Sequence, residues 1–253
     1  MLAVQRVSKH FGGLAALGGV DLAVHPGEIV GLIGPNGAGK TTLFNLITGV
    51  WAPSGGRIAF RDVDITRLPA HRICRLGIGR TFQNIRLSPS MTVFENVWAG
   101  QHCRAGAGLS SLWRSRSRAE RARRDRIEAI LELVGLAAEL DAEAAGLPHA
   151  VLRRVEIARA LATEPALLLL DEPTAGMTPA EAEEIVGVVR AVHGKGPASI
   201  LLIEHSMEVV MALSHRVAVL NSGEMIAEGT PREIQGDPRV IEAYLGAEAG
   251  AGC

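Results

Sequence analysis

The sequence has little of what marks membrane-spanning or nucleic-acid-binding proteins. Its 253 residues include no unbroken apolar run of the roughly 18 to 20 residues that a membrane-spanning helix needs. Aromatic residues make up only 4%, which is too few for repeated base-stacking platforms. Lysine and arginine (26) nearly balance aspartate and glutamate (27), so the net charge is −1 and no overall basic field would attract nucleic acid. We therefore expect no nucleic-acid partner and no membrane span within the chain.

Cysteine is also scarce. Cys74, Cys103 and Cys253 are odd in number and far apart, so they predict neither a disulfide framework nor a metal site. The first ten residues, MLAVQRVSKH, lack the apolar core of a signal peptide. Both observations favour a reducing, cytosolic compartment.

Short apolar strands alternate with helical periodicity along most of the chain, which predicts an α/β protein with a central sheet. A Pro26-Gly27 turn separates two of the expected strands, and Asn221-Ser222-Gly223 indicates a hairpin. The expected strands cover residues 2–7, 20–24, 28–33, 57–60, 167–170, 199–203, 217–220 and 225–228. The expected helices of this core cover residues 41–48, 179–192 and 207–213, with another beginning after Thr230.

Strand patterns disappear in the middle of the chain, where residues 93–98, 116–134 and 152–162 have helical periodicity. We therefore expect a core subdomain of residues 1–83 and 164–245 and an inserted helical subdomain of residues 84–163. Residues 246–253 are small and unpatterned, so we expect a disordered tail there.

A glycine-rich segment after the expected strand of residues 28–33 matches the phosphate-binding pattern G-x-x-x-x-G-K-[ST] in full. Glycines let backbone N–H groups turn inward around phosphate oxygens, and the following helix N-terminus adds partial positive charge. We expect Lys40 to reach the β- and γ-phosphates, Thr41 to ligate Mg²⁺ and Thr42 to lie near the α-phosphate. The residues that form the cradle are Gly34, Asn36, Gly37, Ala38 and Gly39.

The run Leu167-Leu168-Leu169-Leu170 predicts a strand that is buried on both faces and ends in two carboxylates. Asp171 is suited to hold Mg²⁺ through water, and Glu172 to polarise an attacking water. Phosphoryl transfer depends on positioning and charge stabilisation rather than on covalent chemistry by the protein. The two motifs together predict a site that hydrolyses a nucleoside triphosphate with Mg²⁺.

The two motifs, their separation and the helical insertion resemble the ATP-binding cassette (ABC) ATPases over about residues 2–245. The resemblance implies a P-loop NTPase of ABC type, with a mixed central sheet, N-terminal antiparallel strands and an inserted helical subdomain, and it implies ATP and Mg²⁺ as the cofactors. It also implies that Gln83 senses Mg²⁺, that His205 contacts the γ-phosphate as a switch histidine, and that Phe11 stacks on adenine. Their alternatives are a polar strand-end residue, a structural histidine and a packing phenylalanine.

Several stretches are similar to the ATPase subunits of branched-chain amino acid importers. They include Gly77-Ile78-Gly79-Arg80-Thr81-Phe82-Gln83, Leu202-Ile203-Glu204-His205 and the ending Val240-Ile241-Glu242-Ala243-Tyr244-Leu245-Gly246. This resemblance implies transmembrane permease subunits as partners, an extracytoplasmic binding protein that delivers the solute, and a peripheral location on the cytoplasmic face of the membrane. Urea-type importers and lipid-export ATPases are the alternatives within the family.

The signature segment departs from the family pattern. ABC ATPases work as dimers, in which each ATP lies between the P-loop of one subunit and a Leu-Ser-Gly-Gly-Gln signature of the other. The corresponding residues here are Leu147, Pro148, His149, Ala150 and Val151. Pro148 has neither hydroxyl nor N–H to donate, and loss of one aimed donor costs other enzymes about 2.7 to 4 kcal/mol in barrier. We expect the site that this signature completes to hydrolyse poorly, which favours a heterodimer with a second ABC ATPase subunit. The alternative function is a regulatory cassette with little turnover.

Residues 104–126 carry eight arginines against two acidic residues, a local charge of +6 in a nearly neutral chain. A solvated helix face is the first interpretation. Attraction to anionic lipid headgroups beside a permease is the alternative, with nucleic acid third.

Overall fold

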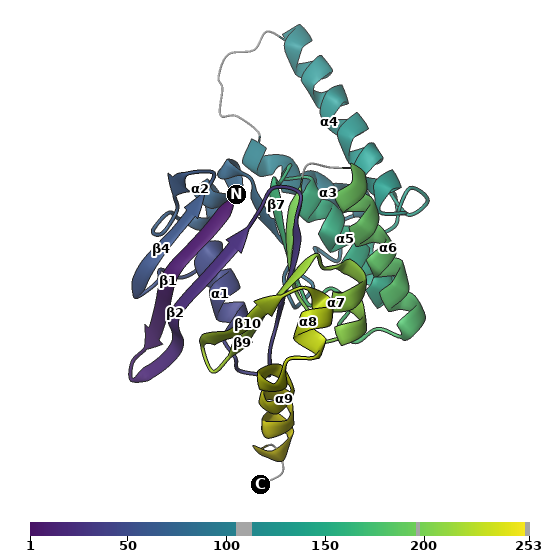
Figure 1. Cartoon of the computed structure of the whole chain (residues 1–253). Helices are drawn as coiled ribbons and strands as arrows, with labels where there is room; N and C mark the ends of the chain where they lie inside the picture. Colours follow the sequence, from purple (N-terminus) through teal and green to yellow (C-terminus); the bar gives the residue numbers. More distant parts are fainter. Residues whose placement is uncertain (105–112, 196–197, 251–253) are drawn as a thin grey trace.

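Two β-sheets form the framework of the chain in the computed structural model, which describes residues 1–104, 113–195 and 198–250 (Figure 1). The first sheet is antiparallel and has the strand order β2-β1-β4-β5. It contains β1 (Leu2–Phe11), β2 (Leu14–Val24), β4 (Gly55–Phe60) and β5 (Val63–Asp64).

The second sheet has the order β10-β9-β3-β8-β7-β6 and is parallel except at its β10 edge. It contains β3 (Ile29–Ile33), β6 (Ile78–Arg80), β7 (Leu167–Asp171), β8 (Ser199–Ile203), β9 (Arg216–Asn221) and β10 (Glu224–Gly229). The predicted α/β class is confirmed. The N-terminal antiparallel strands, however, form a separate sheet instead of joining the central one.

The leucines of β7 show how the two faces of the parallel sheet are filled. Leu167 and Leu169 pack into one core with β1, β2 and the helix α1 (Lys40–Ile47), whereas Leu168 and Leu170 pack into a second core with helices. Successive strand side chains point to opposite faces, so a strand covered on both sides must be apolar throughout. All four leucines are fully buried, as the sequence predicts.

Helices cover the second face. The core on that side gathers apolar residues from α3 (Val93–Gly100), α4 (Trp113–Leu133), α5 (His149–Leu161), α6 (Pro179–Lys195) and α7 (Met207–Leu213). Three of these, α3, α4 and α5, lie in the stretch expected to be helical, together with the short 3₁₀ helices η1 (Gln101–Arg104) and η2 (Ala144–Gly146). The subdomain boundaries themselves stay a prediction.

Several elements escaped the sequence patterns. β6 has only three residues, too few for a periodicity. In α2 (Ala70–Leu76) only Ile73 is buried, so the helix has almost no apolar stripe. The helix α8 (Pro231–Gln235) was predicted and begins after the N-cap Thr230, whereas α9 (Pro238–Gly250) was not predicted. The tail prediction is wrong for residues 246–250, which continue α9, while residues 251–253 lie outside the described residues.

Helix α4 projects from the body of the molecule, at the end opposite α9 (Figure 1). Part of the arginine-rich segment lies outside the described residues, but Arg118, Arg121, Arg124 and Arg126 on α4 are exposed. Arg124 pairs with Glu128 (2.8 Å) and Arg126 with Glu164. These exposed ion pairs agree with a solvated helix face. Across the residues that the structure describes, no helix is both long and apolar enough to cross a bilayer.

Two helical glycines make a matched test of the helix packing. A Cβ on Gly100, at the end of α3, would lie 2.3 Å from the carbonyl oxygen of Arg159 in α5, whereas a Cβ on exposed Gly187 in α6 meets nothing within 4 Å. Gly100→Ala should lower the free energy of unfolding by about 1–3 kcal/mol because the helices must separate. Gly187→Ala should raise it by about 0.5–1 kcal/mol through helix propensity. Urea unfolding of both variants measures the difference, and equal effects would contradict the close α3–α5 approach.

Candidate functional site

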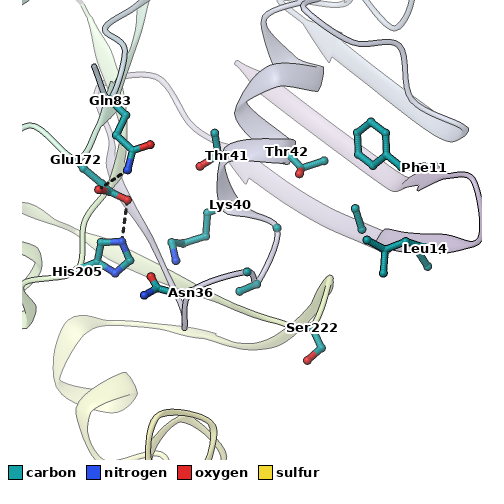
Figure 2. A pocket seen from close by; sticks show the side chains of 15 residues that line it. Phe11, Leu14, Asn36, Lys40, Thr41, Thr42, Gln83, Glu172, His205 and Ser222 are labelled. Atoms are coloured by element: carbon teal, nitrogen blue, oxygen red, sulfur yellow. Dashed lines mark hydrogen bonds and ion pairs between the residues drawn. The ribbon is translucent and has the colours of Figure 1, made fainter. Parts of the chain in front are cut away.

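The carboxyl ends of four parallel strands lie at one edge of the sheet, and the predicted site residues follow them. β3 leads into the loop of residues 34–39, β6 into Gln83, β7 into Glu172 and β8 into His205. Ligands of open α/β sheets bind in the crevice outside the carboxyl ends of the strands. Figure 2 shows Gln83, Glu172 and His205 grouped on one side of Lys40, with Thr42 and Phe11 on the other and Thr41 next to Lys40.

The loop between β3 and α1 depends on glycine backbone conformations. Gly39, the N-cap of α1, has φ 104°, and a Cβ there would lie 2.8 Å from the carbonyl oxygen of Ala16. Gly34 has φ 148°, and its Cβ would lie 1.9 Å from the carbonyl oxygen of Leu220. Side chains are therefore excluded at both ends of the loop. The close approach of neighbouring backbone carbonyls requires glycine at these positions, while the expected cradle for phosphate oxygens stays a prediction.

Lys40 is buried at the start of α1, and its Nζ donates to the carbonyl oxygens of Gly34 (2.6 Å) and Pro35 (2.9 Å). Burial lowers the pKa of Lys40, while the nearby carboxylates of Glu172 and Asp171 oppose that change. The Lys40 ammonium thus lies inside the loop that is expected to bind phosphate. Carbonyl oxygens neutralise only part of its charge, so an anion at this position would be favoured.

Glu172 is held between two of the predicted residues. Gln83 Nε2 donates to Glu172 Oε2 (3.0 Å), and His205 Nε2 lies 2.7 Å from Glu172 Oε1 (Figure 2). Glu172 has φ 50°, a left-handed conformation that non-glycine residues rarely adopt. Its backbone N–H donates to the carbonyl oxygen of Ile203 at the end of β8 (2.9 Å), which helps to hold this conformation. A strained, over-determined carboxylate at a strand end is typical of a functional position.

Glu204, beside His205, is buried and forms three hydrogen bonds. Its Oε1 accepts from the N–H (2.9 Å) and hydroxyl (2.6 Å) of Thr174, and its Oε2 accepts from the N–H of His205 (3.1 Å). It therefore ties the loop after Glu172 to the end of β8. The sequence analysis quoted Glu204 only as part of a motif and assigned it no role.

Asp171 lies beneath Glu172 and is almost fully buried. Its Oδ2 accepts from Arg80 Nη2 (2.8 Å), and Arg80 Nη1 donates to Asn45 Oδ1 (2.7 Å) and Thr48 Oγ1 (3.1 Å) of the α1 region. Burial raises the pKa of Asp171, and the Arg80 guanidinium opposes that rise. Arg80 was missed as a site residue, because nothing in the sequence indicates that it reaches Asp171.

The donor set fits a magnesium ion. Asp171 Oδ1 is buried and has no hydrogen-bond partner, and such an atom needs an explanation such as a water or an ion. The hydroxyl of Thr41, the amide of Gln83 and the two carboxylates supply the oxygen ligands, directly or through water, that Mg²⁺ prefers. Thr41, Gln83 and Asp171 would hold the ion, which would supply charge neutralisation for the phosphates.

A cavity of 580 Å³ joins most of the predicted residues. Phe11 lies at its mouth, 41% exposed, with its ring edge-to-face on Trp51 at a centroid distance of 5.0 Å. An exposed aromatic face at that position suits a nucleobase, although the stacking role stays a prediction. Leu14, Ala15, Ala16 and Ser222 also line the cavity and were not predicted. The predicted lining residues are Phe11, Asn36, Gly37, Ala38, Gly39, Lys40, Thr41, Thr42, Gln83, Glu172 and His205.

The segment of residues 147–151 does not line this cavity and lies at the start of α5. Pro148 is the N-cap and makes no side-chain capping bond. Ala150 is buried, and Leu147 and Val151 pack against the helical core. Apolar side chains thus replace the aimed polar donors that the family pattern would place here. The location at a helix start is as expected, but the role across a dimer remains a prediction.

The sequence matches the ABC transporter family over residues 17–175 and the branched-chain amino acid ATP-binding cassette transporter family over residues 224–250. The chain therefore belongs to the ABC transporter family, as an ATP-binding cassette with the P-loop ATPase fold. Its site residues follow the strands at the expected positions of such an ATPase.

The individual relatives are similar over nearly the full length. The chain is 45% identical to the high-affinity branched-chain amino acid transport ATP-binding protein LivG of Escherichia coli K12, covering 97% of this chain and 98% of the relative. It is 41% identical, with the same coverage, to the corresponding protein BraF of Pseudomonas aeruginosa. A nucleotide-free ATP-binding cassette from an ABC transporter superimposes with a TM-score of 0.85 at 34% identity, covering 96% and 98% of the two chains.

The buried Arg80–Asp171 pair makes a direct test of the site's electrostatics. Arg80→Ala leaves a buried carboxylate without its cation, so it should lower the free energy of unfolding by about 3–5 kcal/mol. Arg57→Ala is the matched control, since Arg57 also pairs with an aspartate from a strand, Asp64, but both side chains are about half exposed. That control should change stability far less. Urea unfolding measures both, and comparable losses would contradict the importance of the buried pair.

Proposed function

We propose that this chain is the ATP-hydrolysing subunit of an importer for branched-chain amino acids, with Mg²⁺ as the metal cofactor. The observation that carries the proposal is the Glu172 carboxylate, held at the end of β7 by Gln83 and His205 and facing the Lys40 loop across the cavity. The solute is supported by the full-length similarity to proteins named for branched-chain amino acid transport.

The residues divide the work of phosphoryl transfer among them. The backbone of the glycine loop, Lys40 and the N-terminus of α1 bind and orient the phosphates. Glu172 accepts a hydrogen bond from the attacking water and orients it. His205, within 2.7 Å of Glu172, holds that carboxylate and faces the same cavity, so that it can contact the terminal phosphate. Gln83 connects this pair to the helical region, because Arg153 in α5 donates to the carbonyl oxygens of Phe82 (2.8 Å) and Gln83 (3.0 Å).

The chain acts in a dimer on the cytoplasmic face of the membrane and docks on permease subunits. An extracytoplasmic binding protein delivers the solute to these permease subunits. A dimeric cassette bound to ADP and phosphate superimposes on this chain with a TM-score of 0.77 at 26% identity, which supports an arrangement of two cassettes. The altered segment of residues 147–151 favours a different ABC ATPase subunit as partner, because two copies of this chain would leave both sites without the signature donors.

Restoring the signature tests the heterodimer. Pro148→Ser together with Ala150→Gly returns a hydroxyl and a close-approach glycine at the start of α5, and Ser is also a better N-cap than Pro. We expect the ATPase turnover of the purified chain alone to rise about tenfold or more, given what one aimed donor contributes.

Lys40→Ala in the restored background should abolish this activity and is the control for contaminating ATPases. Robust ATPase turnover by the unaltered chain alone, together with loss of that turnover in Glu172→Gln, would contradict the proposal that the signature is defective.

Uptake measurements test the solute. Deleting the gene in the source organism should reduce uptake of radiolabelled leucine, isoleucine and valine while leaving urea uptake unchanged. The unaltered gene should restore uptake, and Glu172→Gln should not, because the attacking water is no longer polarised. Lost urea uptake with normal leucine uptake would assign the chain to the urea-type alternative.

A further inference from the structure

The C-terminal helix α9 contacts the phosphate-binding loop through one side chain. The hydroxyl oxygen of Tyr244 accepts a hydrogen bond from the backbone N–H of Gly34 (3.0 Å), across 210 residues of sequence. Tyr244 is the only tyrosine in the chain. Its ring packs against the apolar cluster that contains Ile33, the last residue of β3. A tyrosine ring commonly buries its apolar body while its hydroxyl finds a polar partner.

Gly34 is the residue at which β3 leaves the sheet and the loop begins. Ile33 is still paired with Val219 of β9, but Gly34 has φ 148° and its Cα lies against the carbonyl of Leu220. Its carbonyl oxygen accepts from Lys40 Nζ and its N–H donates to Tyr244. Two side chains, one from each side, thus fix the first peptide groups of the loop.

These two bonds would respond differently to a bound nucleotide. If Lys40 turned toward a phosphate, the carbonyl of Gly34 would lose its charged donor, whereas the bond from the Gly34 N–H to Tyr244 does not involve Lys40. We propose that Tyr244 is a positioning residue for the phosphate-binding loop, which holds Gly34 in place in the nucleotide-bound state and makes ATP affinity depend on the docking of α9. This inference rests on ATP binding by the chain, but not on the transported solute or on the partner.

The position of α9 agrees with this role. A second cavity, of 770 Å³, lies between the loop and α9 and is lined by Pro35 and Asn36 on one side and by Arg239, Glu242 and Ala243 on the other. Tyr244 therefore bridges the two elements beside an open space. The Tyr244 hydroxyl bond to Gly34 is a direct hydrogen bond between α9 and the start of the loop.

Tyr244→Phe removes the hydroxyl and keeps the packed ring. Calorimetric titration of the purified full-length chain with MgATP should show an affinity about three- to tenfold weaker, the range expected for loss of one hydrogen bond that leaves an N–H without a partner. Thermal unfolding without nucleotide should also show some loss of stability, because the Gly34 N–H loses its partner in the free chain as well, although the ring still fills the apolar cluster.

Ser199→Ala is the matched control. The Ser199 hydroxyl also accepts from a glycine N–H, that of Gly27 (2.9 Å), but at the start of β8, on the opposite edge of the sheet from the cavity. This variant should lose thermal stability and bind MgATP as the unaltered chain does. Amide hydrogen exchange at Gly34 gives an independent readout and should be faster in Tyr244→Phe alone.

The inference is overturned if Tyr244→Phe binds MgATP within twofold of the unaltered chain, or if its Gly34 amide exchanges at the same rate. If the unaltered chain itself does not bind MgATP, the proposed function fails instead. The two failures are therefore distinguishable.

Discussion

The whole site depends on the parallel pairing of β6, β7, β8 and β3. Parallel strands bring their carboxyl ends to one edge, where backbone groups leave the ladder and side chains face a shared crevice. Four segments that lie far apart in the sequence thereby place Gln83, Glu172, His205 and the Lys40 loop together. The apolar strands are buried on both faces, and the predicted site residues follow the carboxyl end of each strand.

The charged side chains at these strand ends have different partners. The Asp171 carboxylate is compensated by Arg80 beneath the sheet edge, and Lys40 by loop carbonyls and by more distant carboxylates. Glu172 is left to neutral or titratable partners, Gln83 and His205. Burial raises the pKa of Asp171, and the Arg80 guanidinium opposes that rise. Asp171 therefore has a cation as its partner, whereas the half-buried Glu172 bonds to an amide and an imidazole.

The sequence predicted those parts of the site that are local. The glycine loop and the acidic end of β7 each occupy a short segment, so their residue patterns identified them. The histidine after β8 was implied by the resemblance to ABC ATPases. Arg80 and Tyr244 were not identified as site residues, because their contacts join positions 91 and 210 residues apart, and no local pattern records such a contact. The short strand β6 and the weakly amphipathic α2 were missed for a related reason, since their stability comes from packing against neighbours rather than from periodicity. The helix α9 was missed because its small residues carry little pattern, although it is continuous to Gly250.

The altered start of α5 and the docked α9 concern two different nucleotide sites. The α5 segment would complete a site on a partner subunit, whereas α9 contacts the phosphate-binding loop of this chain. The α5 segment has lost polar donors and gained packing: Val151 joins the helical core, and Pro148 caps the helix with no side-chain bond. Its exposed side chains are Pro148 and His149, beside the amide groups of a first helical turn. The loop side, in contrast, has Lys40 and the glycine backbone in place, and the Tyr244 hydroxyl oxygen accepts from the N–H of Gly34. A cassette with this asymmetry retains what is needed to bind nucleotide with its own loop but contributes little to a site completed by residues 147–151. In a pair of unlike cassettes, its own ATP would meet the intact signature of the other subunit, so that one productive site per dimer would drive the permease.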